Sequence, residues 1–137
     1  MKKSLIVSSI LLSLFLFASI VYAELADWEK QAYYDLLEAY AFSPRNYDNI
    51  CAEVASRHGI TVEELKSIKV KAYAQEPTDW EWKVYDELNK RVGNLSGGAE
   101  GSSNEARKRV YQEVAANYGI RLGELYSIEN RCLDWDY

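Results

Sequence analysis

The sequence predicts an all-α protein with six helices, arranged as two tandem three-helix repeats around one shared core. Residues 53–68 and 113–128 both follow the pattern E-V-A-x-x-x-G-I-x-x-x-E-L-x-S-I, which marks an internal repeat. Apolar residues recur three and four positions apart through most of the chain, as is typical of amphipathic helices. Residues 68–73 come closest to a strand pattern, but they continue a helical stripe equally well.

The first helix of each repeat is predicted at residues 27–41 and 79–92, where apolar or small residues recur four positions apart. The two stripes are Trp28, Ala32, Leu36 and Tyr40, and Trp80, Val84, Leu88 and Val92. Thr78 and Asp79 after Pro77 are candidate N-caps for the second stripe, and Asp27 is one for the first. We expect Trp28 and Trp80 to be core anchors.

The second helices are predicted at residues 46–58 and 105–118, and the third helices at 61–73 and 121–131. Gly59 and Gly119 end the second helices, because glycine readily takes the left-handed conformation that often follows a helix. Thr61 with Glu64 forms a capping box for the first of the third helices. Arg121 replaces the threonine in the second repeat, so we expect that helix to begin less sharply.

The two repeats are joined into what we expect to be one compact domain. Residues 24–76 form the first repeat and residues 77–137 the second, and together they have the usual size of a single domain. Residues 93–103 are rich in glycine and serine and predict a flexible surface loop that lengthens the second repeat.

Residues 1–23 have the pattern of a secretory signal peptide. Lys2 and Lys3 precede an apolar run over residues 5–21, and Val21-Tyr22-Ala23 suits a cleavage site. An uncleaved membrane anchor is the alternative, although the run barely reaches the length needed to span a bilayer. The bacterial-looking start predicts a periplasmic or secreted protein without membrane attachment after cleavage.

The charge of the exported part argues against nucleic-acid partners. Removal of Lys2 and Lys3 leaves 14 basic residues against 21 acidic residues, a net charge of −7. Nucleic-acid affinity comes largely from basic residues that neutralise phosphates, so an acidic protein is poorly suited to it.

Cys51 and Cys132 are the only cysteines. An even count in an oxidising compartment predicts a disulfide between them, which would close a loop of about 80 residues. The alternative is two independent thiols, with Cys51 a small buried apolar residue.

The repeated segment resembles the helix-turn-helix signature. The matching residues are Val54, Ala55, Gly59, Ile60, Leu65 and Ile68 in the first copy and Val114, Ala115, Gly119, Ile120, Leu125 and Ile128 in the second. The resemblance implies a fold element, since these residues meet packing requirements. DNA readers of this shape use the start of the last helix, where this chain instead has Glu63 and Glu64.

Residues 55–65 also resemble, more weakly, the helix pair of LysM modules, which implies binding of peptidoglycan or another glycan. LysM requires a short strand and turn before the pair and a strand after it, and neither copy has them.

No catalytic, cofactor or metal site is expected. His58 follows Cys51 by seven residues on one helical face, but the repeat places Tyr118 and Tyr111 at the equivalent positions, so both are ordinary core-face positions. A single histidine and two thiols supply no metal-ligand cluster. The recurring acids Glu53, Glu113, Glu64 and Glu124 leave a small carboxylate-dependent hydrolase open, although acids beside a helix start are usually caps.

We therefore expect an exported, non-catalytic helical module that binds a protein or another envelope component, with a glycan as the alternative ligand. Trp82, Trp135 and Tyr137 are the candidate contact residues, because aromatic rings outside the core often mark interfaces. Any locally encoded function should lie where the copies differ, at His58 against Tyr118, at Gly123 against Glu63, and in the long loop.

Overall fold

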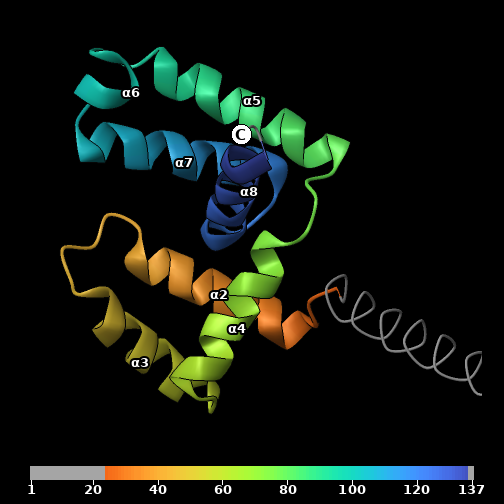
Figure 1. Cartoon of the computed structure of the whole chain (residues 1–137). Helices are drawn as coiled ribbons and strands as arrows, with labels where there is room; N and C mark the ends of the chain where they lie inside the picture. The colour runs from red at the N-terminus through yellow and green to blue at the C-terminus, as the bar shows by residue number, and fades with distance from the viewer. Residues whose placement is uncertain (1–23, 136–137) are drawn as a thin grey trace, which may run out of the picture.

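The computed structural model describes residues 24–135, and these form helices joined by turns and short connections, without a strand (Figure 1). The all-α prediction is confirmed. The predicted signal peptide at residues 1–23 and the candidate contact residue Tyr137 lie outside the described residues.

Every predicted helix is present with similar bounds. The first half holds α2 (Asp27–Tyr40), α3 (Tyr47–His58) and α4 (Val62–Tyr73), and the second holds α5 (Asp79–Gly93), α7 (Asn104–Tyr118) and α8 (Leu122–Trp135). A single-turn helix, α6 (Gly98–Gly101), lies within the segment expected to be only a loop.

Side-chain caps set most of the helix starts. Thr61 accepts a hydrogen bond from the Glu64 amide at 3.1 Å, and Thr78 accepts one from the Glu81 amide at 3.3 Å. Asp27 is not the cap of α2, because it is already the first helical residue, and the Glu29 carboxylate instead accepts from the Ala26 amide at 2.9 Å.

The helix α8 of the second half also packs on the first half. It packs against α2 and α4 of the first half and against α5 and α7 of the second, as Figure 1 shows near the centre of the view. Buried residues of both halves form one hydrophobic cluster, which includes Leu36, Val54, Leu88 and Leu125. The expected shared core is therefore built around α8.

The expectation that Trp28 and Trp80 anchor the core is wrong. Trp28 is 54% exposed and Trp80 is 43% exposed. Residues spaced strictly four apart are rotated by about 40° at each step around a helix. The tryptophan at the start of each stripe is therefore rotated away from the buried face. The buried face of α2 is instead made by Ala32, Tyr33, Leu36 and Leu37 together with Glu29.

The expected disulfide is absent, since Cys51 and Cys132 are both buried and are not bonded to each other. Cys51 lies on α3, which packs on α2 and α4, whereas Cys132 lies on α8, whose neighbours include α2 and α4 as well. The two cysteines thus enter the common core from separate helices. Each is a small buried residue of the core.

Within residues 24–135, no helix has both the length and the apolar character needed to cross a membrane.

Candidate functional site

Two positions at which the copies differ, Arg121 and Gly123, form the joint between the two halves. Arg121, which stands where the first copy has Thr61, reaches α2 from the start of α8. Its Nε donates to Glu38 Oε1 at 3.1 Å, and its other nitrogens hydrogen-bond to Gln31 and Asp35. His58 joins the same cluster through a 2.8 Å hydrogen bond between its Nε2 and Asp35 Oδ2.

Glu38 also replaces the missing N-cap of α8. Its Oε1 accepts a hydrogen bond from the Gly123 amide at 2.8 Å. The start of α8 is therefore satisfied by a carboxylate from the other half, which suits the positive end of a helix dipole. We expected α8 to begin less sharply because Arg121 replaces a capping threonine. The contact between Glu38 and the Gly123 amide takes the place of that cap.

The cluster changes the ionisation of Asp35. Burial by itself would raise the pKa of this carboxyl, but the hydrogen bonds from Arg121 and His58 outweigh it and hold the pKa below its usual value. Asp35 is thus an ionised structural partner of Arg121, and His58 is engaged with it rather than with Cys51.

These contacts also bear on the helix-turn-helix resemblance. The start of α8, which DNA readers would present to a groove, is packed on α2 through Arg121 and Gly123. The corresponding start of α4 exposes Glu63 and Glu64. Neither end offers a basic surface to phosphates.

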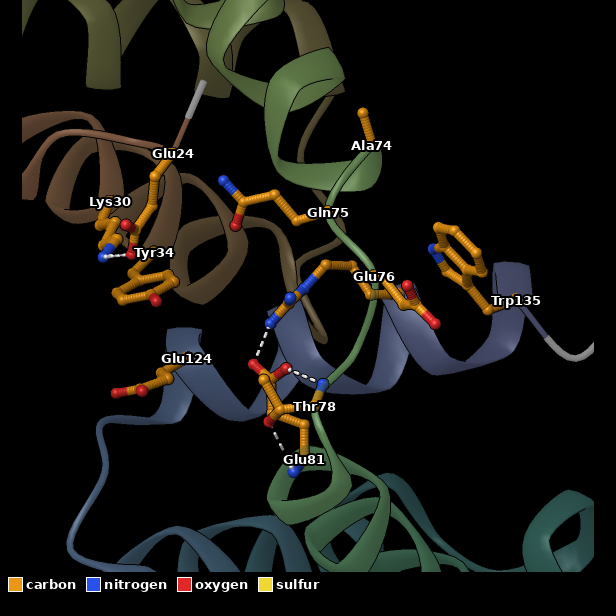
Figure 2. Close-up of a pocket in the computed structure, with 11 residues that line it drawn as sticks. Glu24, Lys30, Tyr34, Ala74, Gln75, Glu76, Thr78, Glu81, Glu124 and Trp135 are labelled. Carbon is orange, nitrogen blue, oxygen red and sulfur yellow. Dashed lines mark hydrogen bonds and ion pairs between the residues drawn. The ribbon is translucent and has the colours of Figure 1, made fainter. Parts of the chain in front are cut away.

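The candidate site is a cleft of about 520 Å³ that is lined by residues of α2, of α8, and of the segment that joins α4 to α5. We call it the central cleft, and Figure 2 shows it with its lining side chains. It is lined by Glu24, Lys30, Tyr34, Ala74, Gln75, Glu76, Thr78, Glu81, Glu124, Arg131 and Trp135. Its size falls within the usual range of ligand-binding clefts, roughly 300 to 1,000 Å³.

Glu81 holds one wall of the central cleft together. Its Oε2 accepts a hydrogen bond from the Thr78 amide at 2.8 Å, and its Oε1 accepts one from Arg131, as the dashed lines in Figure 2 show. Arg131 is only 8% exposed, so this ion pair is largely removed from water. Both oxygens of Glu81 are therefore occupied by structural contacts.

Glu124 also lines the central cleft, and its pKa is shifted. It occupies the position in α8 that Glu64 occupies in α4, where Glu64 accepts from the Thr61 amide at 2.7 Å. Burial, and secondarily the nearby charge of Glu81, raise the pKa of Glu124 above its usual value. The repeat-related acids thus have different roles, one as a cap and one as a cleft residue.

Gln75 contributes an unsatisfied donor. Its Nε2 is buried and has no hydrogen-bond partner among the described residues. Buried polar atoms are nearly always paired in folded proteins, so this amide nitrogen calls for an acceptor from water or a ligand.

Of the contact residues predicted from the sequence, the structure places only Trp135 at the central cleft, where its side chain is 48% exposed. Trp82 is half-buried and packs edge-on against Tyr85, with the ring centroids 5.8 Å apart. It therefore belongs to the edge of the core. The sequence analysis did not identify Tyr34 and Gln75 as cleft residues. No local pattern in the sequence marks either residue as part of a cleft.

No group of three or more His, Cys, Asp or Glu residues within 24–135 is arranged to hold a metal ion.

Comparison of the chain with models of known protein families, with curated proteins and with solved structures finds no match.

Proposed function

We propose that this chain is an exported, non-catalytic helical module that binds a protein partner of the cell envelope through the central cleft. The observation that carries the proposal is Trp135, whose half-exposed ring lies at a cleft formed between the two halves. Tryptophans in such positions commonly dominate binding energy, because they bury a large area at little cost in side-chain entropy.

The charges of the central cleft favour a basic polypeptide segment. Lys30 pairs with Glu24 at 3.4 Å, and Arg131 pairs with Glu81, so the lining leaves Glu76 and Glu124 in excess. A partner that supplies a Lys or Arg side chain would offset that excess, and a backbone carbonyl would satisfy Gln75 Nε2. A polypeptide offers the cation, the carbonyl and an apolar surface for Trp135 together.

A carboxylate-dependent hydrolase is the second candidate, because two acids in different surroundings, Glu81 and Glu124, share the central cleft. The pKa of Glu124 is raised, and Glu81 is ion-paired with Arg131, which resembles the acid and base roles of glycosidase carboxylates. Against it stands the use of both Glu81 oxygens in structural hydrogen bonds, with the Thr78 amide and with Arg131, which make this carboxylate part of the fold.

The LysM-like alternative receives no support from the fold, since LysM needs strands and residues 24–135 contain none. Export remains a proposal that depends on residues 1–23 and is tested by envelope fractionation of the tagged chain.

The binding proposal is tested in two steps. A photo-cross-linking residue replaces Ala74, which lines the central cleft, and a matched one replaces Val70, which is 69% exposed outside it. A protein that cross-links from position 74 and not from position 70 is then purified. Its affinity is measured for the wild-type chain, Trp135→Ala and the control Trp28→Ala.

We expect Trp135→Ala to weaken binding by about 30-fold, the usual scale of an interface hot spot, and Trp28→Ala to have no more than about a twofold effect. Equal affinities for wild type and Trp135→Ala would overturn the proposal. Turnover of a glycan or peptide substrate that disappears in Glu124→Gln would establish the hydrolase instead.

A further inference from the structure

A second pocket lies on the opposite side of α8 from the central cleft. Glu124, Arg131 and Trp135 face the central cleft, whereas Tyr126, Glu129 and Leu133 line the other pocket. At about 100° per residue these two sets lie on opposite sides of one helix. The second pocket has a volume of about 290 Å³ and is closed by α7 and by the segment after α2. We call it the tyrosine pocket.

The walls of the tyrosine pocket are aromatic. The Tyr111 and Tyr126 rings have centroids 5.1 Å apart, and Phe42 stands edge-on to both, at 6.1 Å and 6.4 Å. Tyr111 and Tyr126 are buried, whereas Phe42 is 37% exposed. Phe42 thus lies at the boundary between the pocket and solvent.

Phe42 is held in an unusual backbone conformation. Its φ is +56°, a left-handed value that bulky side chains seldom take because it strains the backbone. Such strain persists only where the surrounding structure imposes it, and it is found preferentially at functional sites. Here the conformation keeps the ring against the two tyrosines.

Two residues that line the tyrosine pocket, Arg107 and Tyr126, each carry a buried polar atom without a partner among the described residues. These atoms are the hydroxyl of Tyr126 and the Nε of Arg107. Tyr126 as a whole is only 7% exposed and lines the pocket. Arg107 Nε can only donate, so it requires an acceptor, while the tyrosine hydroxyl can donate or accept.

Glu129, whose side chain is partly buried, adds an acceptor. The Tyr111 hydroxyl donates to its Oε1 at 2.5 Å. Burial raises the pKa of Glu129, although the Tyr111 hydrogen bond and the charge of Arg107 oppose that rise. The pocket therefore pairs one potential negative charge with one positive charge, and its formal charges cancel.

We propose that the tyrosine pocket binds a single neutral sugar ring, with its apolar face against Phe42 and its hydroxyls between Arg107, Tyr126 and Glu129. Each sugar hydroxyl both donates and accepts, so a ring can satisfy the donor of Arg107 and the acceptor of Glu129 together. The small volume limits the ligand to about one ring.

Other ligand classes fit the tyrosine pocket less well. A ligand with a net charge would be attracted by one of Arg107 and Glu129 but repelled by the other, since both groups lie at the same pocket. A hydrocarbon would leave Arg107 Nε and the Tyr126 hydroxyl without partners, at a cost for each buried group. A neutral ring rich in hydroxyls avoids these penalties.

The proposal is tested by titrating the chain with glucose and N-acetylglucosamine and following its amide resonances by NMR. Sorbitol, which has hydroxyls but no ring, and benzoate, which has a ring and a negative charge, are the control ligands. We expect saturable shifts of residues around Tyr126 with one of the sugars and none with either control. Absence of saturation with both sugars up to their solubility, or equal binding of sorbitol or benzoate, would overturn the proposal.

Variants locate the binding. Tyr126→Phe removes one hydroxyl and should weaken sugar binding by about five- to tenfold. Tyr33→Phe is the matched control, because it removes a hydroxyl that is likewise buried, from a residue that lines none of the pockets described above.

Phe42→Gly removes the ring at a position where glycine accepts the positive φ, and it should abolish detectable binding. Equal effects of Tyr126→Phe and Tyr33→Phe would count against the tyrosine pocket. Trp135→Ala should leave sugar binding unchanged, so the outcome is independent of the function proposed for the central cleft.

Discussion

The backbone of α8 at Gly123 lies directly against the backbone of α2 at Tyr34. A Cβ atom at Gly123 would stand 2.8 Å from the Tyr34 Cα and even nearer to its carbonyl group. Only glycine allows the two helices to approach this closely, and the approach brings Arg121 within reach of Glu38 and Asp35. The joint between the halves therefore depends on a residue without a side chain.

Gly123→Ala should destabilise the fold although alanine is the better helix former. The added methyl group overlaps backbone atoms that cannot move independently, so we expect a loss of about 1–3 kcal/mol in the free energy of unfolding, measured with urea. Gly93→Ala is the control, because its Cβ would have no neighbour within 4 Å. That change should leave stability unaltered or raise it by up to about 1 kcal/mol. Equal effects at the two positions would contradict the close approach.

Asp35→Asn should weaken the joint in a pH-dependent way. The pKa of Asp35 in the folded chain is below its unfolded value of 3.8, so its contribution is fully present above that value and is lost as pH falls through the folded pKa. At neutral pH the variant should lose about 1–2 kcal/mol, because Arg121 and His58 each lose a charged partner. Well below that folded pKa the difference between the two chains should shrink, as unfolding titrations at several pH values would show. A constant difference at all pH values would contradict this role.

Glu129→Gln should have the opposite pH dependence. Burial raises the folded pKa of Glu129 above 4.5, so the wild-type chain loses stability from this group as pH rises through that folded pKa. Glutamine can still accept the hydrogen bond from Tyr111 but does not ionise. We expect the variant to gain stability relative to wild type between acidic and neutral pH, measured by thermal unfolding. Parallel pH profiles would show that Glu129 is not desolvated as the structure has it.

Trp28→Ala should have little effect on stability. The side chain is 54% exposed, so its removal should change the free energy of unfolding by no more than about 1 kcal/mol. Leu88→Ala, at a position with no exposure, should cost about 2–5 kcal/mol. Denaturant unfolding of the two variants compares them directly. A larger loss of unfolding free energy for Trp28→Ala than for Leu88→Ala would show that Trp28 is a core residue.

Most of the secondary structure could be predicted because it is encoded locally. Thr61 with Glu64 and Thr78 with Glu81 start helices through contacts three residues apart, and Gly59 and Gly119 end helices at φ values of +66°. The orientation of the tryptophans could not be predicted in the same way. Residues spaced four apart stay on one face of a helix for only about two turns. Trp28 lies outside the part of α2 that packs on the core.

The candidate sites were largely hidden from the sequence. The central cleft joins Tyr34 of α2, Gln75 of the linker and Glu124 of α8, which are far apart along the chain. The tyrosine pocket joins Phe42, Arg107 and Glu129 in the same manner. Trp135 was singled out only because no core position was assigned to it.

The sequence by itself determined that this protein is helical, where its helices begin and end, and which residues recur as their packing faces, because each of those features depends on neighbours within about one turn. The tertiary structure alone decided what the differences between the copies mean. Gly123 and His58 were two positions where function was expected, and both instead make structural contacts with α2. Gly123 and the neighbouring Arg121 join the second half to Tyr34 and Glu38, whereas His58 contacts Asp35 within the first half. Pairing of that kind depends on the packing of α8 against α2, which no local pattern in the sequence records.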